Sequence, residues 1–101
     1  MRVLLIYDIV HDGRRTKVSE ACLDYGLDRL QYSAFIGQLN KTFQEELMMR
    51  IEDILDGTPA SVHLYSIDES AWKKRIIIEQ GMNRAEREEE RDVPLSADEP
   101  F

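Results

Sequence analysis

The stretch YDIVHDGRR, which begins at Tyr7, holds the residues best suited to chemistry. Magnesium prefers hard oxygen ligands and often takes only one or two carboxylates together with water and substrate phosphate, a role that Asp8 fits. The alternative is that Asp8 ends a strand and satisfies backbone N–H groups of a turn. His11 and Asp12 are close in sequence, but a turn separates them from Asp8. We interpret His11 as an exposed turn residue and Asp12 as a helix cap.

Two adjacent cations, Arg14 and Arg15, follow at a predicted helix start. The helix dipole disfavours positive charge at that end, so an arginine pair there suggests a phosphate ligand that also uses the free N–H groups. The alternative is a solvated charged face with a pair to Asp12. Lys17 and Arg29 are weaker candidates for the same contact. The pattern predicts a nucleic-acid-binding surface.

A small set of strands and helices must position these residues. Arg2–Ile9 is an apolar run rich in β-branched residues, which is typical of a central strand buried on both faces. Apolar residues at helical spacing predict a helix over Gly13–Tyr25, and Gly26 follows where a left-handed cap is expected. Leu27–Leu39 alternates imperfectly, which predicts two consecutive strands with a bend near Gln31–Ser33.

The rest of the pattern predicts a second helix and two further strands. Asn40 or Thr42 is expected to cap a second helix, which stops at the Gly-Thr-Pro run 57–59. Ser61–Ile67 is a further strand, and Ile76–Ile78 a short fifth one. The resulting order, strand–helix–strand–strand–helix–strand, predicts an α+β ferredoxin-like fold with one antiparallel sheet and both helices on one face.

Charge divides the 101 residues into two parts. Residues 1–78 carry 12 acidic and 10 basic groups and are predicted to form one ferredoxin-like domain. Residues 79–101 carry 8 acidic and 3 basic groups and are predicted to be an acidic C-terminal tail, in which 84–92 is either a solvated helix or disordered. The net charge of −7 argues against indiscriminate nucleic-acid coating but leaves room for a local basic patch.

The sequence also indicates in which cellular compartment the protein is expected. No run approaches the roughly 18–20 apolar residues that span a bilayer, and the run at Val3–Ile9 is too short for a signal peptide. The single Cys22 excludes an internal disulfide framework and fits a reducing environment. We therefore expect a cytoplasmic protein with no membrane partner.

A sheet with both helices on one face leaves its other face to be covered. Two such faces packed together would bury both, which predicts an isologous homodimer. The short strand Ile76–Ile78 would extend the sheet of the partner by edge addition. His63, in an alternating strand, is expected at the surface or in an interface, and Trp72 in the core or an interface.

These residues together carry a resemblance. The strand end Tyr7-Asp8-Ile9 leads to a Gly-Arg-Arg helix start, that helix ends at Tyr25-Gly26, and the strand Gln31-Tyr32-Ser33-Ala34-Phe35 follows. Over residues 1–78 the chain resembles the CRISPR-associated endoribonuclease family, the small core protein of CRISPR adaptation that partners the CRISPR integrase.

The resemblance implies a ferredoxin-like homodimer that bridges integrase dimers on protospacer DNA during spacer acquisition, with duplex DNA and single-stranded RNA as candidate ligands. It also implies a metal-dependent endonuclease. The acidic residue of the family falls on Asp8, as catalytic residue and ligand of magnesium or another divalent cation, and its arginines fall on Arg14 and Arg15. One Asp per chain supplies few protein ligands for a metal ion, but a two-fold axis would bring two copies of Asp8 together.

The remaining motif residues have simpler interpretations beside those implied by the resemblance. The Ser-x-Phe of the family falls on Ser33 and Phe35, which would lie next to the substrate. From the residues alone, Ser33 bonds locally and Phe35 is core. Tyr7 is a core or interface aromatic, with base stacking as the alternative. Ile36 stands where the family often carries Glu, which puts in doubt any polar role for that position.

Two other functions fit the same fold. One is a stand-alone RNA-cleaving toxin-like nuclease, and the other is a non-catalytic ferredoxin-like regulatory module, because the fold alone does not give function. A regulatory module would need a ligand-binding loop, often Gly-rich, and none is apparent in the sequence.

Overall fold

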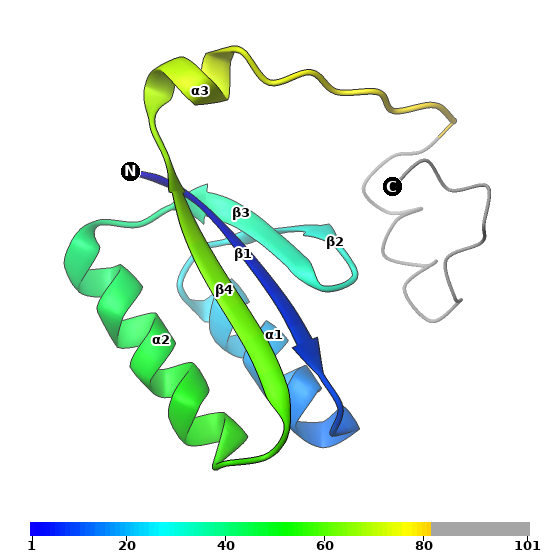
Figure 1. The fold of residues 1–101 in the computed structure, drawn as a ribbon, viewed down its shortest axis with the longest axis vertical. Helices are drawn as coiled ribbons and strands as arrows, with labels where there is room; N and C mark the ends of the chain where they lie inside the picture. Colours follow the sequence, from blue (N-terminus) through cyan, green and yellow to red (C-terminus); the bar gives the residue numbers. More distant parts are fainter. Residues whose placement is uncertain (82–101) are drawn as a thin grey trace.

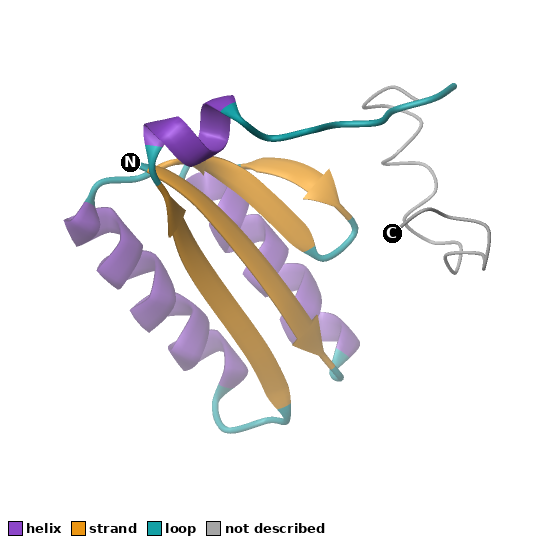
Figure 2. Ribbon diagram, turned by 45° about the horizontal axis from the view of Figure 1, so that its top comes forward, coloured by secondary structure: helices purple, strands orange, loops and turns teal. Residues whose placement is uncertain are grey.

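A computed structural model of the chain describes residues 1–81. It contains one four-stranded sheet in the order β2-β3-β1-β4, with every neighbouring pair antiparallel and both long helices on one face (Figures 1 and 2). The predicted α+β class and ferredoxin-like order are confirmed. The elements are β1 (Arg2–Ile9), α1 (Asp12–Asp24), β2 (Asp28–Gln31), β3 (Ala34–Gln38), α2 (Lys41–Leu55), β4 (Ala60–Ile67) and a short α3 (Glu69–Lys73).

The start of α1 differs from the prediction. The helix begins at Asp12, and its cap is His11, whose Nδ1 accepts the backbone N–H of Arg14 at 3.2 Å. The assignment of Asp12 as the cap was therefore wrong, because a neutral imidazole nitrogen can accept the same hydrogen bond as a cap carboxylate. At the other end, Gly26 has φ +84°, the left-handed conformation that was predicted for it.

The helix α2 has the caps that its sequence suggests. Asn40 accepts the N–H of Phe43 through its side chain at 2.8 Å, so Asn40 rather than Thr42 is the cap. The helix ends at Leu55, and its C-cap Asp56 is in the left-handed conformation, so the helix stops just before the Gly-Thr-Pro run that was predicted to end it. The guanidinium of Arg50 pairs with Asp24 at 2.8 Å and ties this helix to the end of α1.

The predicted break in the segment after α1 is also confirmed. Tyr32 and Ser33 form a turn that separates β2 from β3, and the pairing of these strands shifts register between Arg29 and Gln31. Gly37 of β3 lies under Leu27, and a Cβ there would come within 2.7 Å of the Leu27 side chain. The chain thus crosses closely over β3 as it enters the sheet.

The core lies between the sheet and the two long helices. In β1 the odd-numbered residues are buried, whereas the even-numbered residues face the side without helices and are half-buried or exposed. The prediction that this strand is buried on both faces is therefore wrong for a single chain, because helices cover only one face. The buried residues are Val3, Leu5, Tyr7, Ile9, Val18, Ala21, Cys22, Leu27, Phe35, Leu39, Leu47 and Ile51.

The fifth strand predicted at Ile76–Ile78 is not formed within a single chain. The helix α3 turns the chain away from the sheet, and the residues after it run out as an extended segment (Figure 1). No strand within residues 1–81 lies beside them to supply backbone partners, and Ile76 is 92% exposed. Edge addition to the sheet of a partner stays a prediction.

The acidic tail predicted over residues 79–101 lies outside the described residues from 82 onward. The division of the chain at residues 78 and 79 stays a prediction. Among the helices within residues 1–81, none combines the length and the apolar character needed to cross a membrane.

Candidate metal and nucleic-acid site

Asp8 lies near the end of β1 on the face of the sheet that no helix covers. We call this surface the open face, and it is formed by Leu4, Ile6, Asp8, Ala34, Ile36, Ser61, His63 and Tyr65. Asp8 is exposed, and its register partner on β4 is Ser61. Within residues 1–81 its carboxylate makes no hydrogen bond or ion pair. The alternative in which Asp8 satisfies turn N–H groups is thus not what the described residues show.

The neighbouring acceptors do not join Asp8 in a metal site. His11 is used as the helix cap, and Asp12 forms an ion pair with Arg15. Within residues 1–81 no three His, Cys, Asp or Glu side chains come together as metal ligands would. The role of Asp8 as a metal ligand stays a prediction.

Arg14 has a partner inside the domain. Its guanidinium donates to the carbonyl of Ile54 at 2.6 Å. Ile54 lies in the last turn of α2, where carbonyls lack intrahelical partners and where the helix has no basic residue of its own. Arg14 therefore places a cation at the negative end of that helix and ties the start of α1 to the end of α2. A phosphate contact by Arg14 stays a prediction.

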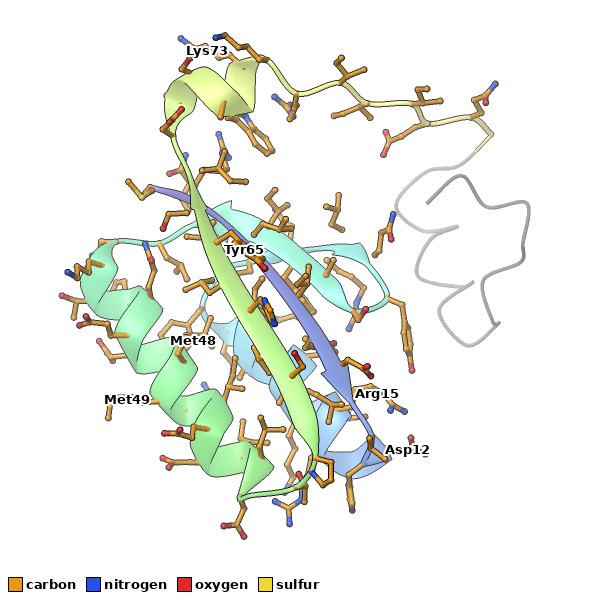
Figure 3. All side chains as sticks on the ribbon, in the orientation of Figure 1. Asp12, Arg15, Met48, Met49, Tyr65 and Lys73 are labelled. Atoms are coloured by element: carbon orange, nitrogen blue, oxygen red, sulfur yellow. The ribbon has the colours of Figure 1, made fainter. Side chains whose placement is uncertain are left out.

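Arg15 contacts the residue that follows Asp8. Its guanidinium donates to the carbonyl of Ile9 at 2.8 Å and to the carboxylate of Asp12, and it lies 6.0 Å from the centre of the Tyr32 ring. The hydrogen bond to Asp12 raises the pKa of Arg15. Figure 3 shows Asp12 and Arg15 side by side at the end of β1.

Lys17 lies two residues after Arg15 in α1. It is exposed, and it makes no hydrogen bond or ion pair within residues 1–81. Because α1 covers the face of the sheet opposite the open face (Figure 2), the structure gives no contact between Lys17 and Asp8, and the phosphate contacts of Arg15 and Lys17 stay predictions.

Of the other predicted site residues, Tyr7 and Phe35 lie in the core and Ser33 lies in a turn near Asp8. Tyr7 and Phe35 are 6% and 0% exposed, and their stacked rings have centres 6.2 Å apart, so both are core residues. Burial raises the pKa of the Tyr7 phenol, which donates toward the carbonyl of Tyr32 at 3.5 Å. The carbonyl of Ser33 accepts the Tyr7 N–H at 3.0 Å. That bond brings the Ser33 turn alongside Asp8, and a substrate-adjacent role of Ser33 stays a prediction.

A polar network on the open face was missed from the sequence. His63 lies opposite Ile6, and its two ring nitrogens contact the hydroxyls of Ser61 at 3.1 Å and Tyr65 at 2.7 Å. The sequence did contain a signal, because residues two apart on a strand share a face. The network lies next to Asp8 through the pairing of Asp8 with Ser61.

The fold and the site define a class: a small ferredoxin-like α+β protein with one helix-free sheet face and an exposed carboxylate at its end. Comparison with known proteins narrows that class. The family model described as CRISPR associated protein Cas2 matches residues 1–75, and the chain belongs to this family.

Individual relatives agree with the family assignment. The chain is 48% identical over 80 residues to a CRISPR-associated endoribonuclease Cas2 of Chloroflexus aurantiacus, a match that covers 79% of this chain and 94% of that protein. It is 34% identical over 68 residues to a CRISPR-associated endonuclease Cas1/endonuclease Cas2 fusion of Thermoproteus tenax, covering 67% of this chain and 26% of the fusion. The crystal structure of Streptococcus pyogenes Cas2 is 26% identical with a TM-score of 0.66, and the match covers 79% of this chain and 100% of that one.

Proposed function

We propose that this chain acts in CRISPR adaptation as a homodimer that bridges integrase dimers on protospacer DNA, and that it also cleaves phosphodiester bonds with a divalent metal. Membership of the family and the endoribonuclease names of the relatives support a nuclease role. The fusion of a Cas1 and a Cas2 endonuclease in one relative supports partnership with the integrase. The observation that carries the proposal is the exposed Asp8 carboxylate on the open face.

The open face supports the homodimer. Its central residues Leu4, Ile36 and Tyr65 are register neighbours, and Ile6 and Tyr65 are 37% and 47% exposed. An apolar sheet face that no helix covers gains from burial, at about 25 cal/mol per Å² of apolar surface removed from water. Packing against the same face of a second copy covers both faces with one two-fold interface.

A second contact supports the same assembly. The strand β4 lies at the edge of the sheet, and beside it an open groove is lined by Val62 and by the α2 residues Met48, Met49, Ile51, Glu52 and Leu55. In Figure 3, Met48 lies on the side of α2 that faces this strand, whereas Met49 lies on the outer side of the helix. The exposed Ile76–Ile78 segment of the partner adds as a strand to this edge and lays its side chains on the groove.

The dimer completes the metal site. Asp8 fits the hard oxygen chemistry of magnesium, because its carboxylate is exposed and carries no hydrogen bond within residues 1–81. One Asp8 from each copy, meeting near the two-fold axis, would hold the ion. A divalent cation in that position supplies charge neutralisation on a phosphate and lowers the pKa of its bound water. Without it the two carboxylates repel each other.

The chain supplies the nucleic-acid contacts around that position. Arg15 lies beside the strand end that carries Asp8, with its guanidinium held by the Ile9 carbonyl, so its charge is fixed in place. Lys17 adds an exposed cation on the same helix, and Arg14 adds charge through its second terminal guanidinium nitrogen, since one donates to Ile54 and Nε is buried. These groups bind phosphates of duplex DNA or single-stranded RNA and orient the backbone toward Asp8.

The test is cleavage of labelled single-stranded RNA and duplex DNA by wild type and Asp8→Asn, with magnesium and with a chelator. Asp53→Asn is the matched control, because Asp53 is an exposed carboxylate on α2, away from the open face. We expect cleavage with magnesium by wild type and Asp53→Asn, and none by Asp8→Asn, with all three proteins dimeric by light scattering. Cleavage by Asp8→Asn at the wild-type rate would overturn the nuclease role of Asp8.

The scaffold role is separable from cleavage in the same experiment. If Asp8→Asn is inactive but still binds duplex DNA and the integrase with wild-type affinity, the assembly role stands on surfaces other than the metal site. A monomeric wild-type protein at micromolar concentration would contradict the scaffold proposal, whatever the cleavage result.

A further inference from the structure

An exposed aromatic residue that does not belong to the core lies near Asp8. Tyr32 is in the turn between β2 and β3 and is 41% exposed. The next residue, Ser33, accepts the backbone N–H of Tyr7 at 3.0 Å, and Tyr7 directly precedes Asp8 in β1. The turn therefore places Tyr32 at the same end of the sheet as Asp8, beyond the strand residues that form the open face.

The backbone of this turn is held by groups that are anchored in the core. The Tyr32 carbonyl accepts hydrogen bonds from the Arg29 guanidinium at 2.5 Å and from the Tyr7 phenol at 3.5 Å. Arg29 in turn lies over the buried Phe35 ring, 4.8 Å from its centre. These bonds reach the main chain at position 32 and leave the tyrosine ring free of them. With only two rotatable bonds on a fixed backbone, the ring offers a flat apolar surface at low entropy cost.

A cation suited to phosphate lies next to the ring. The Arg15 guanidinium is 6.0 Å from the centre of the Tyr32 ring, and its hydrogen bond to the Ile9 carbonyl at 2.8 Å fixes it at the end of β1. Each nucleotide of a single strand offers a phosphate together with an unpaired base, and proteins bind such bases by stacking them on aromatic rings. In a duplex the bases are already stacked on one another, so mainly the phosphates are accessible to Arg15.

We propose that Tyr32 stacks on an unpaired base and thereby selects single-stranded nucleic acid at the cleavage site. A phosphate next to that base contacts Arg15, and Arg29 is the positioning residue that holds the turn. The inference rests on the proposed nuclease role, and it adds to that role a substrate class and a residue that determines specificity. Duplex DNA is held through its phosphates and gains nothing from the ring.

The test measures binding without cleavage, by fluorescence anisotropy in the presence of a chelator. The dye-labelled ligands are a single-stranded RNA, the same strand paired with its complement, and a strand of equal length that lacks all bases. The abasic strand offers the same phosphates without any base to stack. Because cleavage is suppressed, a failure of the stacking proposal is distinguishable from a failure of Asp8 to support cleavage.

Tyr32→Ala should bind the single strand about 5- to 150-fold more weakly, the loss expected for one base–aromatic stack, and should bind the duplex and the abasic strand within about twofold of wild type. Tyr32→Phe keeps the ring and should bind like wild type. The salt slope should be the same for all variants, because stacking releases no counterions. Phe43→Ala is the matched control, since Phe43 is 47% exposed on α2, which begins beside the end of β1 opposite to Asp8, and it should change none of the affinities.

Several results would overturn the proposal. One is wild-type affinity of Tyr32→Ala for the single strand. Another is an equal loss for all three ligands, because the ring would then act on the phosphates or on the fold. Loss of integrase binding with unchanged RNA binding would show that the turn contacts a protein instead of a base. Should Tyr32→Ala prove unfolded in urea titrations, Tyr32→Leu replaces it as the variant without a ring, and equal single-strand affinity of Tyr32→Leu and Tyr32→Phe would exclude stacking.

Discussion

Replacing Arg14 with alanine separates two roles that the sequence left open. In the structure its guanidinium donates to the Ile54 carbonyl at 2.6 Å, across the contact between α1 and α2. The last turn of α2 contains no basic residue. The Arg14 guanidinium therefore also places a positive charge at the negative end of that helix. Arg14→Ala removes both interactions and leaves the carbonyl to water.

The size of the effect follows from the geometry. A hydrogen bond from a charged donor contributes about 1.5–3 kcal/mol, and because Arg14 is half-buried we take the lower part of that range, about 1.5–2 kcal/mol. For a domain of this size each kcal/mol lowers Tm by about 4–8 °C, so Arg14→Ala should melt roughly 6–16 °C below wild type.

The assay is urea and thermal unfolding followed by circular dichroism. Lys17→Ala is the control, since Lys17 is exposed on the same helix without a partner in the described part of the chain, and it should change stability by at most about 0.5 kcal/mol. If Arg14→Ala unfolds like Lys17→Ala but binds duplex DNA with a reduced salt slope, Arg14 is a phosphate ligand and the helix-tie account is wrong.

Three further changes test local features of the fold. His11→Ala should lose about 1 kcal/mol of stability, because it removes the α1 cap, and His11→Asp should restore it; equal stability of the alanine variant and wild type would refute the cap. Gly37→Ala places a Cβ within 2.7 Å of the Leu27 side chain and should cost about 1–3 kcal/mol in urea unfolding; a smaller cost of the same change in a Leu27→Ala background would argue for the contact. Burial raises the pKa of the Cys22 thiol to about 12, so the thiol ionises first in the unfolded chain. Stability should therefore be complete below about pH 9 and fall above it, by up to about 1.4 kcal/mol per pH unit, with a flatter profile for Cys22→Ala.

The fold was predictable because local signals agreed with one another. The left-handed Gly26 and the turn at Tyr32 each mark an element boundary where the sequence predicted it, and the cap of α2 is Asn40, one of the two residues predicted. The helix cap at His11 was missed because imidazole is an uncommon cap beside an aspartate that fits the usual pattern. The hydrophobic pattern alone did not reveal that β1 is buried on only one face, because Leu4 and Ile6 on the other face are as apolar as the buried residues between them.

The roles of the candidate site residues stay predictions, and their contacts could not be predicted from the sequence. Asp8 is exposed at the strand end, as a ligand must be, whereas the carbonyl that holds Arg14 belongs to Ile54, 40 residues away in sequence. Every residue has a backbone carbonyl, so the residue types do not indicate which carbonyl accepts this hydrogen bond. The stacking of Arg2 on Trp72 joins the two ends of the described chain, and likewise depends on the sheet pairing of β1 with β4.

The central claim is that two Asp8 carboxylates share one divalent ion across a dimer axis. The most direct measurement is titration of the purified protein with Mn²⁺, with free ion counted by electron paramagnetic resonance and dimer confirmed by light scattering in the same buffer. We predict one bound ion for every two chains in wild type and in Asp53→Asn, and loss of that ion in Asp8→Asn. One ion per chain, or unchanged binding in Asp8→Asn, would contradict the shared site.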